Sequence, residues 1–383
     1  MIPNKNTFCV APFNSLYVGP TGNITPCCLF DKPTKYKFHE TEDYYHSEDL
    51  NKVRNNLING VKDNNCNACW KQEEAGGDSL RLILNRTVGK DITQAINNLD
   101  TKNIKSFDLQ LGNLCNLKCV MCSPKWSSQI LAEININQEM KKFYKHGNLK
   151  QNEFNWPKEN DFAKWCEKFL PQSIHIKLTG GEPFINPWLF KTLENIPTSQ
   201  KEKCILHFTT NLTIINDKIL NILKKFKETW ISVSVDGIED TFEYIRFGHT
   251  WNIIKKNIDT ILNVKENIKL SINCVIQAPV LPNIVNMVNY FDTKKIKIRP
   301  IILTSPKKLT LSSLKEQFKN NIIKDLQNYK GYNQEFINVV KSVIKDNINH
   351  DNELAQECVH YLDNIDKIRN TNFKNIIPVD CFI

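Results

Sequence analysis

The sequence lacks any apolar run that approaches the ~18 residues of a membrane-spanning helix, and its mean hydropathy is −0.40. It also lacks a basic N-terminal patch followed by a long apolar stretch, so it shows no secretory signal. No internal repeat and no long low-complexity linker interrupts the chain. These absences exclude a spanning or secreted protein from our expectations, and we expect a cytoplasmic protein with no membrane partner.

The excess of positive charge is not concentrated in one stretch. The net charge is +9, but the lysines are scattered as short pairs such as Lys224-Lys225 and Lys255-Lys256. No motif that combines aromatic and basic residues for nucleic-acid binding accompanies them, so the sequence does not favour a nucleic-acid partner. A solvated basic surface is the plainest interpretation, and docking of an acidic protein or a phosphorylated substrate stays open.

Cysteine is abundant, with 13 residues in 383. An odd number fits poorly with a closed disulfide framework. In an intracellular setting, thiolate ligands or buried thiols are the expected states of these residues. The cysteines therefore direct the search for function toward metal sites.

The chain is long enough for two or three units at about 150 residues per domain. We expect three regions: a turn-rich, cysteine-rich N-terminal unit at 1–100, a barrel at 101–304, and a helical extension at 305–383. Short apolar segments of β character alternate with helix-like stretches in the second region, which is typical of βα units around a parallel sheet. The candidate strands are 107–111, 173–179, 204–210, 230–235, 269–276 and 295–303.

This pattern predicts an α/β fold with a partial (β/α)6 barrel of the TIM type, a small N-terminal metal-binding unit and a helical C-terminal region. Apolar spacing predicts helices over 49–61 near the N-terminus and over 311–326, 335–344 and 354–368 near the C-terminus. In parallel barrels, working residues gather at the carboxyl ends of the strands. We therefore expect the functional residues of this chain at the carboxyl ends of the candidate strands.

A loop with three closely spaced cysteines comes directly after the first candidate strand. Cys115, Cys119 and Cys122 form a Cys-x3-Cys-x2-Cys pattern, and thiolates are the usual ligands of iron–sulfur clusters. Three protein ligands leave one iron of a cubane cluster open to an exogenous chelating group. A three-cysteine zinc site completed by a distant histidine is the alternative that the loop alone leaves open.

The loop resembles the cluster loop of the radical S-adenosylmethionine (SAM) superfamily, which has this spacing and a hydrophobic or aromatic residue before the third cysteine, here Met121. The resemblance implies that SAM chelates the open iron of a 4Fe–4S cluster. It also implies that reduction cleaves SAM to a 5′-deoxyadenosyl radical, which removes a hydrogen atom from a substrate. The fold that it implies is the radical SAM partial barrel.

Further motifs at strand ends extend the resemblance. Gly180-Gly181-Glu182 looks like the family's Gly-Gly-Glu motif, which implies that the carboxylate receives the SAM ammonium group. Asn211 is similar to the Asn of a Thr-Asn-Gly motif, although Leu212 replaces its glycine. Ser234 and Arg246 resemble the Ser-x-Asp-Gly and downstream Arg of peptide-modifying members, which implies contacts to the ribose and the SAM carboxylate. Asn273 and Gln277 are weaker candidates, equally interpretable as structural polar groups.

A second group of cysteines lies near the N-terminus. Four thiolates suffice to close a second, auxiliary 4Fe–4S cluster. The Cys-x12-Gly-x4-Cys spacing resembles the opening of the SPASM and twitch domains of radical SAM enzymes, here placed before the barrel, and the segment Glu73–Arg81 also resembles members with an N-terminal twitch domain. The resemblance implies one auxiliary cluster on four ligands, Cys9, Cys27, Cys66 and Cys69.

Two ambiguities remain in this group. Cys28 is adjacent to Cys27, so either could be the ligand, and the same cysteines could hold structural zinc. The other cysteines fall inside helix-like or strand-like segments, where free cysteine behaves as a small buried hydrophobe, and we assign them no function: Cys166, Cys204, Cys274, Cys358 and Cys381.

The resemblance implies a radical SAM enzyme that acts on a peptide or protein side chain, with a small molecule such as a sugar or nucleotide as the alternative substrate. Because the chain begins close to Cys9, we expect no N-terminal leader-binding domain. A flavodoxin or ferredoxin is the expected electron donor, and its acidic surface suits the basic one here. A non-catalytic metal-stabilised binding protein is the alternative of another class. The sequence names no acid, base or radical-relay residue.

Overall fold

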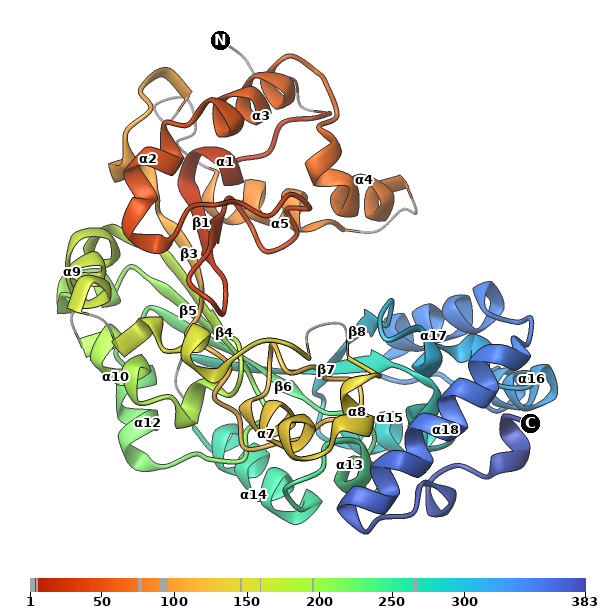
Figure 1. The fold of residues 1–383 in the computed structure, drawn as a ribbon. Helices are drawn as coiled ribbons and strands as arrows, with labels where there is room; N and C mark the ends of the chain where they lie inside the picture. Colours follow the sequence, from red (N-terminus) through yellow and green to blue (C-terminus); the bar gives the residue numbers. More distant parts are fainter. Residues whose placement is uncertain are drawn as a thin grey trace. The chain divides into compact units, whose positions relative to one another are not determined.

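A computed structural model describes residues 4, 6–74, 78–89, 96–144, 147–158, 160–194, 196–264 and 267–383. The chain forms two compact units (Figure 1). The first comprises Met1–Leu114, Lys150–Phe208 and Asp217–Thr229, and the second comprises Cys115–Leu149, Thr209–Asn216 and Trp230–Ile383. These units divide the chain differently from the three ranges expected from the sequence, which stay a prediction.

The predicted α/β fold is confirmed, with each of the six expected strands present. The strands are β1 (Ser15–Val18), β2 (Ile24–Thr25), β3 (Ser106–Gln110), β4 (His175–Thr179), β5 (Ile205–Thr210), β6 (Glu228–Ser234), β7 (Ile268–Ile276) and β8 (Lys297–Ile302). The sheet is mostly parallel, because β1, β3, β4 and β5 pair side by side in parallel, as do β7 and β8. The pair β1 and β2 is antiparallel.

The sequence did not reveal β1 and β2. Strand β1 pairs with β3, so part of the N-terminal region extends the sheet of the first unit instead of folding apart from it. The reason is local length: four residues and two residues are too short for an alternating pattern to stand out. The parallel registers place Tyr17, Asp108, Lys177 and His207 side by side on adjacent strands, and Lys177 Nζ lies 2.9 Å from Asp108 Oδ2.

Helices follow the strands in both units (Figure 1). Those of the first unit are α1 (Ala11–Asn14), α2 (Thr41–Tyr45), α3 (Glu48–Ile58), α4 (Asn67–Glu74), α5 (Leu80–Val88), α9 (Asn160–Phe169), α10 (Pro187–Glu194), α11 (Thr198–Lys201) and α12 (Asp217–Leu223). Those of the second are α7 (Ser128–Ile136), α8 (Gln138–Lys141), α13 (Glu239–Ile245), α14 (Trp251–Leu262), α15 (Ile284–Thr293), α16 (Glu316–Asp325), α17 (Gln334–Asp346) and α18 (Asn352–Arg369).

The predicted helical C-terminal region is confirmed by α16, α17 and α18. Helix α18 begins where Asp351 accepts a hydrogen bond from the Leu354 amide, and it ends at Asn370, which adopts the left-handed conformation common at helix ends. Its inner face is apolar and fully buried at Ala355, Cys358 and Leu362. Burial of this face, rather than helix propensity alone, holds the helix in place.

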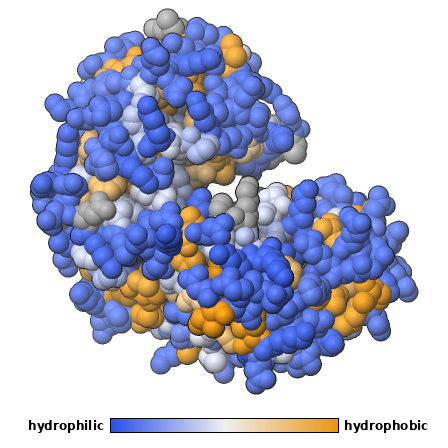
Figure 2. Space-filling view, viewed as in Figure 1, coloured by the Kyte–Doolittle hydropathy of each residue, from blue (hydrophilic) through white to orange (hydrophobic). Residues whose placement is uncertain are grey.

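The described helices include none long and apolar enough to cross a membrane. On the face shown in Figure 2, hydrophilic residues predominate and hydrophobic ones form separate patches. Single exposed apolar side chains such as Ile136 are normal on protein surfaces.

Candidate functional site

The three cysteines of the Cys-x3-Cys-x2-Cys pattern lie together on the loop between β3 and α7. Cys115 and Cys119 are buried in one apolar cluster with Leu117, and Met121 and Cys122 pack against it. Burial raises the pKa of Cys122, and the neighbouring Cys119 and Cys115 thiols raise it further. Local spacing has therefore produced a compact set of three thiols.

This donor set fits an iron–sulfur cluster, for which cysteine thiolates are the usual ligands. Among the described residues, no group of three or more His, Cys, Asp or Glu side chains is arranged to hold a single metal ion. In a cubane cluster each thiolate binds a different iron, so the three sulfur atoms lie farther apart than they would around a single metal ion. The fit therefore rests on the three thiols and their burial.

Arg246 is buried beside the cysteine loop. Its Nη2 atom lies 2.7 Å from Asp236 Oδ2, and its Nη1 atom donates to the Cys119 thiol at 3.7 Å. Burial raises the pKa of Cys119, and the Arg246 guanidinium acts in the opposite direction. The arrangement places a cation where it stabilises negative charge at Cys119. The pairing of Arg246 with Asp236 was not predicted from the sequence.

Asn211, at the end of β5, also faces the cysteine loop. Its Nδ2 atom donates to Asn116 Oδ1 at 2.9 Å and lies 4.0 Å from Cys115 Sγ. The adjacent Leu212 stands where the resembling motif has glycine, and its φ is +53°. The backbone thus adopts a left-handed conformation there without glycine. Sequence reasoning did not identify Asn116 as the partner of Asn211.

The glycine-rich segment after β4 closes against the residue that precedes Cys115 in the chain. The Glu182 amide donates to the Leu114 carbonyl at 2.7 Å, and Glu182 Oε1 accepts from the Phe184 amide at 3.0 Å. Gly181 has φ +57°, and a Cβ atom there would lie 2.1 Å from the Leu114 carbonyl oxygen. Only glycine permits this approach. A Cβ atom on Gly180 would lie 2.7 Å from the Cβ atom of Gln110.

Polar groups at the ends of β6 and β7 differ in their burial. Ser234 is half-buried, whereas Gln277 is fully buried. Neither Nε2 nor Oε1 of Gln277 has a hydrogen-bond partner among the described residues. An unpaired buried amide costs about 1–3 kcal/mol, so it indicates a site that a ligand or a water completes. This orphaned amide is consistent with a cofactor pocket in the second unit.

The N-terminal cysteines gather in the core of the first unit. Cys9 is buried there, with Cys27 and Cys66 packed against the same apolar cluster. Burial raises the pKa of Cys9 to about 12, and the nearby Cys69 thiol acts in the same direction. The structure therefore brings all four predicted ligands into one neighbourhood. Of the segment Glu73–Arg81, which also carried the resemblance, residues 75–77 lie outside the described residues.

Cys28 faces a different environment from Cys27. Burial raises the pKa of Cys28 to about 12, the Asp108 carboxylate acts in the same direction, and the Lys177 ammonium acts in the opposite direction. Burial also raises the pKa of Cys27, and the thiols of Cys28, Cys9 and Cys66 raise it further. Of the two adjacent thiols, Cys27 is the one that packs against the apolar cluster that contains Cys9.

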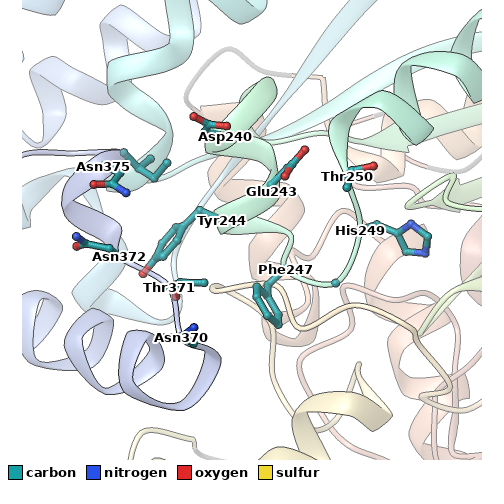
Figure 3. A pocket seen from close by; sticks show the side chains of 12 residues that line it. Asp240, Glu243, Tyr244, Phe247, His249, Thr250, Asn370, Thr371, Asn372 and Asn375 are labelled. Carbon is teal, nitrogen blue, oxygen red and sulfur yellow. The ribbon is translucent and has the colours of Figure 1, made fainter.

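A cavity of about 770 Å³ in the second unit is lined in part by residues on both sides of Arg246 in the chain (Figure 3). Figure 3 shows Asp240, Glu243 and Tyr244 of α13 on one side and the segment 370–376 on the other. None of the site residues expected from the sequence lines this cavity.

Residues 109–286 match the family described as "Radical SAM superfamily". The chain contains a radical SAM domain. Domains of this superfamily use a 4Fe–4S cluster and SAM, so the predicted cofactor pair is confirmed at the level of the family. The matched range contains the cysteine loop, the Gly180–Glu182 segment, Asn211, Ser234 and Arg246. The auxiliary cysteines lie outside it, and the auxiliary cluster stays a prediction.

Curated relatives include the "Probable GTP 3′,8-cyclase" of Methanococcus maripaludis strain C6, which is 27% identical over 165 residues. The aligned part is 43% of this chain and 47% of the relative. The corresponding protein of strain C7 matches with the same identity and coverage. The chain therefore spans about half the length of the curated relatives that it matches.

The solved structures that the chain resembles share less sequence identity with it. "Native anSMEcpe with bound AdoMet" aligns over 58% of both chains with a TM-score of 0.38 and 14% identity. "Crystal structure of Streptococcus suis SuiB bound to precursor peptide SuiA" aligns over 78% of this chain and 65% of that one, with a TM-score of 0.39 and 13% identity. Similarity at this level adds nothing to the family assignment, which rests on the matched domain.

Proposed function

We propose that the chain reductively cleaves SAM and removes a hydrogen atom from a peptide or protein side chain. The observation that carries the proposal is the packing of three cysteine thiols on one loop of the radical SAM domain. The test is anaerobic reconstitution of the full chain with iron and sulfide, followed by dithionite reduction and an assay for 5′-deoxyadenosine. Binding of metal without SAM cleavage would instead support a non-catalytic metal-stabilised protein.

The proposed roles follow the positions of the residues. Cys115, Cys119 and Cys122 would hold the cluster, which supplies the electron that cleaves SAM, and Met121 packs against them. Arg246 keeps a positive charge at Cys119, and the Asp236 carboxylate orients its guanidinium. As the resemblance implies, Arg246 would contact the SAM carboxylate and Ser234 would contact the ribose.

The buried Glu182 carboxylate would receive the SAM ammonium group in a charge-assisted hydrogen bond. Gly180 and Gly181 allow the backbone of this segment to approach its neighbours closely. Asn211 fixes Asn116, the residue after the first cysteine, through the 2.9 Å hydrogen bond. Each of these residues positions the pocket without taking part in the bond cleavage itself.

The substrate class is supported by one motif. Ser234, Asp236 and Arg246 resemble the Ser-x-Asp-Gly and Arg of peptide-modifying members, and the Asp236–Arg246 ion pair joins both parts of that motif. A nucleotide is the second candidate, and the similarity to proteins named probable GTP 3′,8-cyclases favours it. If the reduced holoenzyme consumes GTP and does not react with peptides, the substrate is a nucleotide.

We further propose that Cys9, Cys27, Cys66 and Cys69 hold an auxiliary 4Fe–4S cluster, which binds substrate or accepts an electron as the product forms. Their common neighbourhood in the first unit supports this. A flavodoxin or ferredoxin would supply the electron for SAM cleavage, and the net charge of +9 suits an acidic donor.

Substitution of Gly181 by alanine is expected to remove about four irons per chain, the content of one cubane cluster. The added Cβ would overlap the Leu114 carbonyl and displace the residue before Cys115. Gly60→Ala is the matched control, because Gly60 also has a positive φ of +86° but its added Cβ would meet only the flexible Asn4 side chain. Iron counting after reconstitution compares the two, and equal iron contents would contradict the expectation.

Substitution of Gln277 by leucine is expected to weaken SAM binding about tenfold while leaving the melting temperature of the metal-free chain unchanged or higher. The reason is that leucine removes two buried polar atoms that have no partner among the described residues. Asn257→Leu is the contrasting control, because its Nδ2 atom donates to the Leu212 carbonyl at 2.8 Å and its loss should lower the melting temperature. A lower melting temperature with unchanged SAM affinity in Gln277→Leu would show that Gln277 stabilises the fold and does not bind SAM.

A further inference from the structure

The backbone of the cysteine loop is hydrogen-bonded on both sides of Cys119. The Lys118 amide donates to the Phe247 carbonyl and the Val120 amide donates to the Ile245 carbonyl, each at 2.8 Å. These two bonds come from the end of α13 and the residues after it. They satisfy the N–H groups of Lys118 and Val120, so the carbonyl groups of the same two residues need other hydrogen-bond partners.

The two carbonyls are bonded by side chains of α18. Arg369 Nη1 donates to the Lys118 carbonyl at 2.7 Å, and the Tyr361 hydroxyl donates to the Val120 carbonyl at 2.7 Å. The donors lie 251 and 241 residues further along the chain than their acceptors. A helix outside the matched domain therefore completes the hydrogen bonding of the residues that flank Cys119.

The arginine of this pair is itself fixed. Arg369 Nε and Nη2 donate to the two carboxylate oxygens of Glu133 in α7, at 3.1 and 2.8 Å, and Lys118 Nζ lies 3.1 Å from Glu133 Oε1. The side chains of Arg369 and Glu133 are only 1% and 3% exposed. Burial acts to raise the pKa of Glu133, but hydrogen bonds from Arg369 and Lys118 outweigh it and hold the pKa below its usual value.

We propose that α18 is a positioning element for the cysteine loop, in which Arg369 and Tyr361 fix the backbone on both sides of Cys119 and thereby orient its thiol. The inference rests on the proposed function, because it takes this loop to be the cluster loop. Both residues act through the backbone of Lys118 and Val120 and are positioning residues. The loop is thus held in a ligand-ready form before any metal binds.

A second consequence is electrostatic. Lys118, Arg369 and Glu133 together carry one net positive charge close to the loop; the side chains of Arg369 and Glu133 are buried, and that of Lys118 is 28% exposed. Positive charge beside thiolates favours addition of an electron to the group they bind. We therefore expect Arg369 to raise the reduction potential of the cluster as well as to position the loop.

The positioning part is tested on the metal-free chain by amide hydrogen exchange of the peptide that covers residues 115–122. Tyr361→Phe removes only the hydroxyl that bonds Val120, and we expect exchange in this peptide to become about tenfold faster. Tyr144→Phe is the matched control, because the Tyr144 hydroxyl contacts the Tyr361 hydroxyl at 3.0 Å and, among the described residues, makes no hydrogen bond to residues 115–122. Equal exchange in the two variants and the wild type would overturn the positioning role.

The electrostatic part is tested on the reconstituted chain. Arg369→Met lowers the net charge of the three side chains from +1 to 0 and leaves Glu133 paired with Lys118, whereas Arg369→Lys keeps the charge but not the two-point bond. We expect a more negative midpoint potential and an altered EPR signal of the reduced cluster in Arg369→Met, and a potential close to that of the wild type in Arg369→Lys. An unchanged potential in Arg369→Met would overturn the electrostatic role.

The two kinds of failure are distinguishable. Hydrogen exchange in the metal-free chain reports on the positioning of the loop whether or not the loop binds a cluster. If exchange responds as expected but wild-type protein binds no iron at Cys115, Cys119 and Cys122, the proposed function is wrong and the hydrogen-bonded contact between α18 and the loop still stands.

Discussion

Replacement of Cys115, Cys119 and Cys122 by alanine is expected to abolish formation of 5′-deoxyadenosine and to lower the iron content from about eight to about four per chain, one cubane cluster being lost and one retained. The physical reason is that these three thiols form one packed set, so removal of all three leaves the cluster without protein ligands. Iron counting, EPR and the 5′-deoxyadenosine assay after dithionite reduction measure the effect.

The control for this experiment removes three thiols that the proposal does not use. Cys166, Cys204 and Cys381 are buried free cysteines to which we assign no metal. A variant with alanine at these positions should lose some stability through small cavities and should keep both its iron and its SAM cleavage. Zinc binding by the wild-type chain without cleavage of SAM would contradict the proposal. It would show that the metal has a structural role.

Substitution of Cys27 by alanine is expected to remove about four irons, whereas substitution of Cys28 should leave the iron content at about eight. The two residues are adjacent in the sequence, but Cys27 packs against the apolar cluster that contains Cys9, whereas the pKa of Cys28 is raised by the nearby Asp108 carboxylate. Each variant is thus the matched control of the other. We also expect Cys27→Ala to retain cleavage of SAM, since the ligands of the SAM-binding cluster are unchanged.

The opposite outcomes have clear meanings. Iron loss from Cys28→Ala alone would show that Cys28 is the ligand and that the side chains rearrange when metal binds. Full iron content in both variants, together with loss of zinc from either, would favour a structural zinc site in the N-terminal region.

Much of the fold could be predicted because its signals are local. The six expected strands were found close to their expected ranges because buried parallel strands consist of short apolar segments with few polar interruptions. The thiols of Cys115, Cys119 and Cys122 were predicted to lie together, since so short a spacing leaves the side chains little room to separate. Strand β1 was missed because four residues carry too little pattern, and only its pairing with β3 defines it.

The sequence by itself determined the alternation of strands and helices, the cysteine loop and the grouping of cysteines near the N-terminus. Only the tertiary structure decided that Cys27 packs against the cluster that contains Cys9, that Asp236 pairs with Arg246, and that Arg369 and Tyr361 of α18 are hydrogen-bonded to the loop around Cys119. The reason is the distance along the chain. Spacing in the sequence constrains only neighbours a few residues apart. The contacts of Tyr361 and Arg369 with the loop join residues separated by 241 and 251 positions, and they form only when the packed core brings helix and loop together.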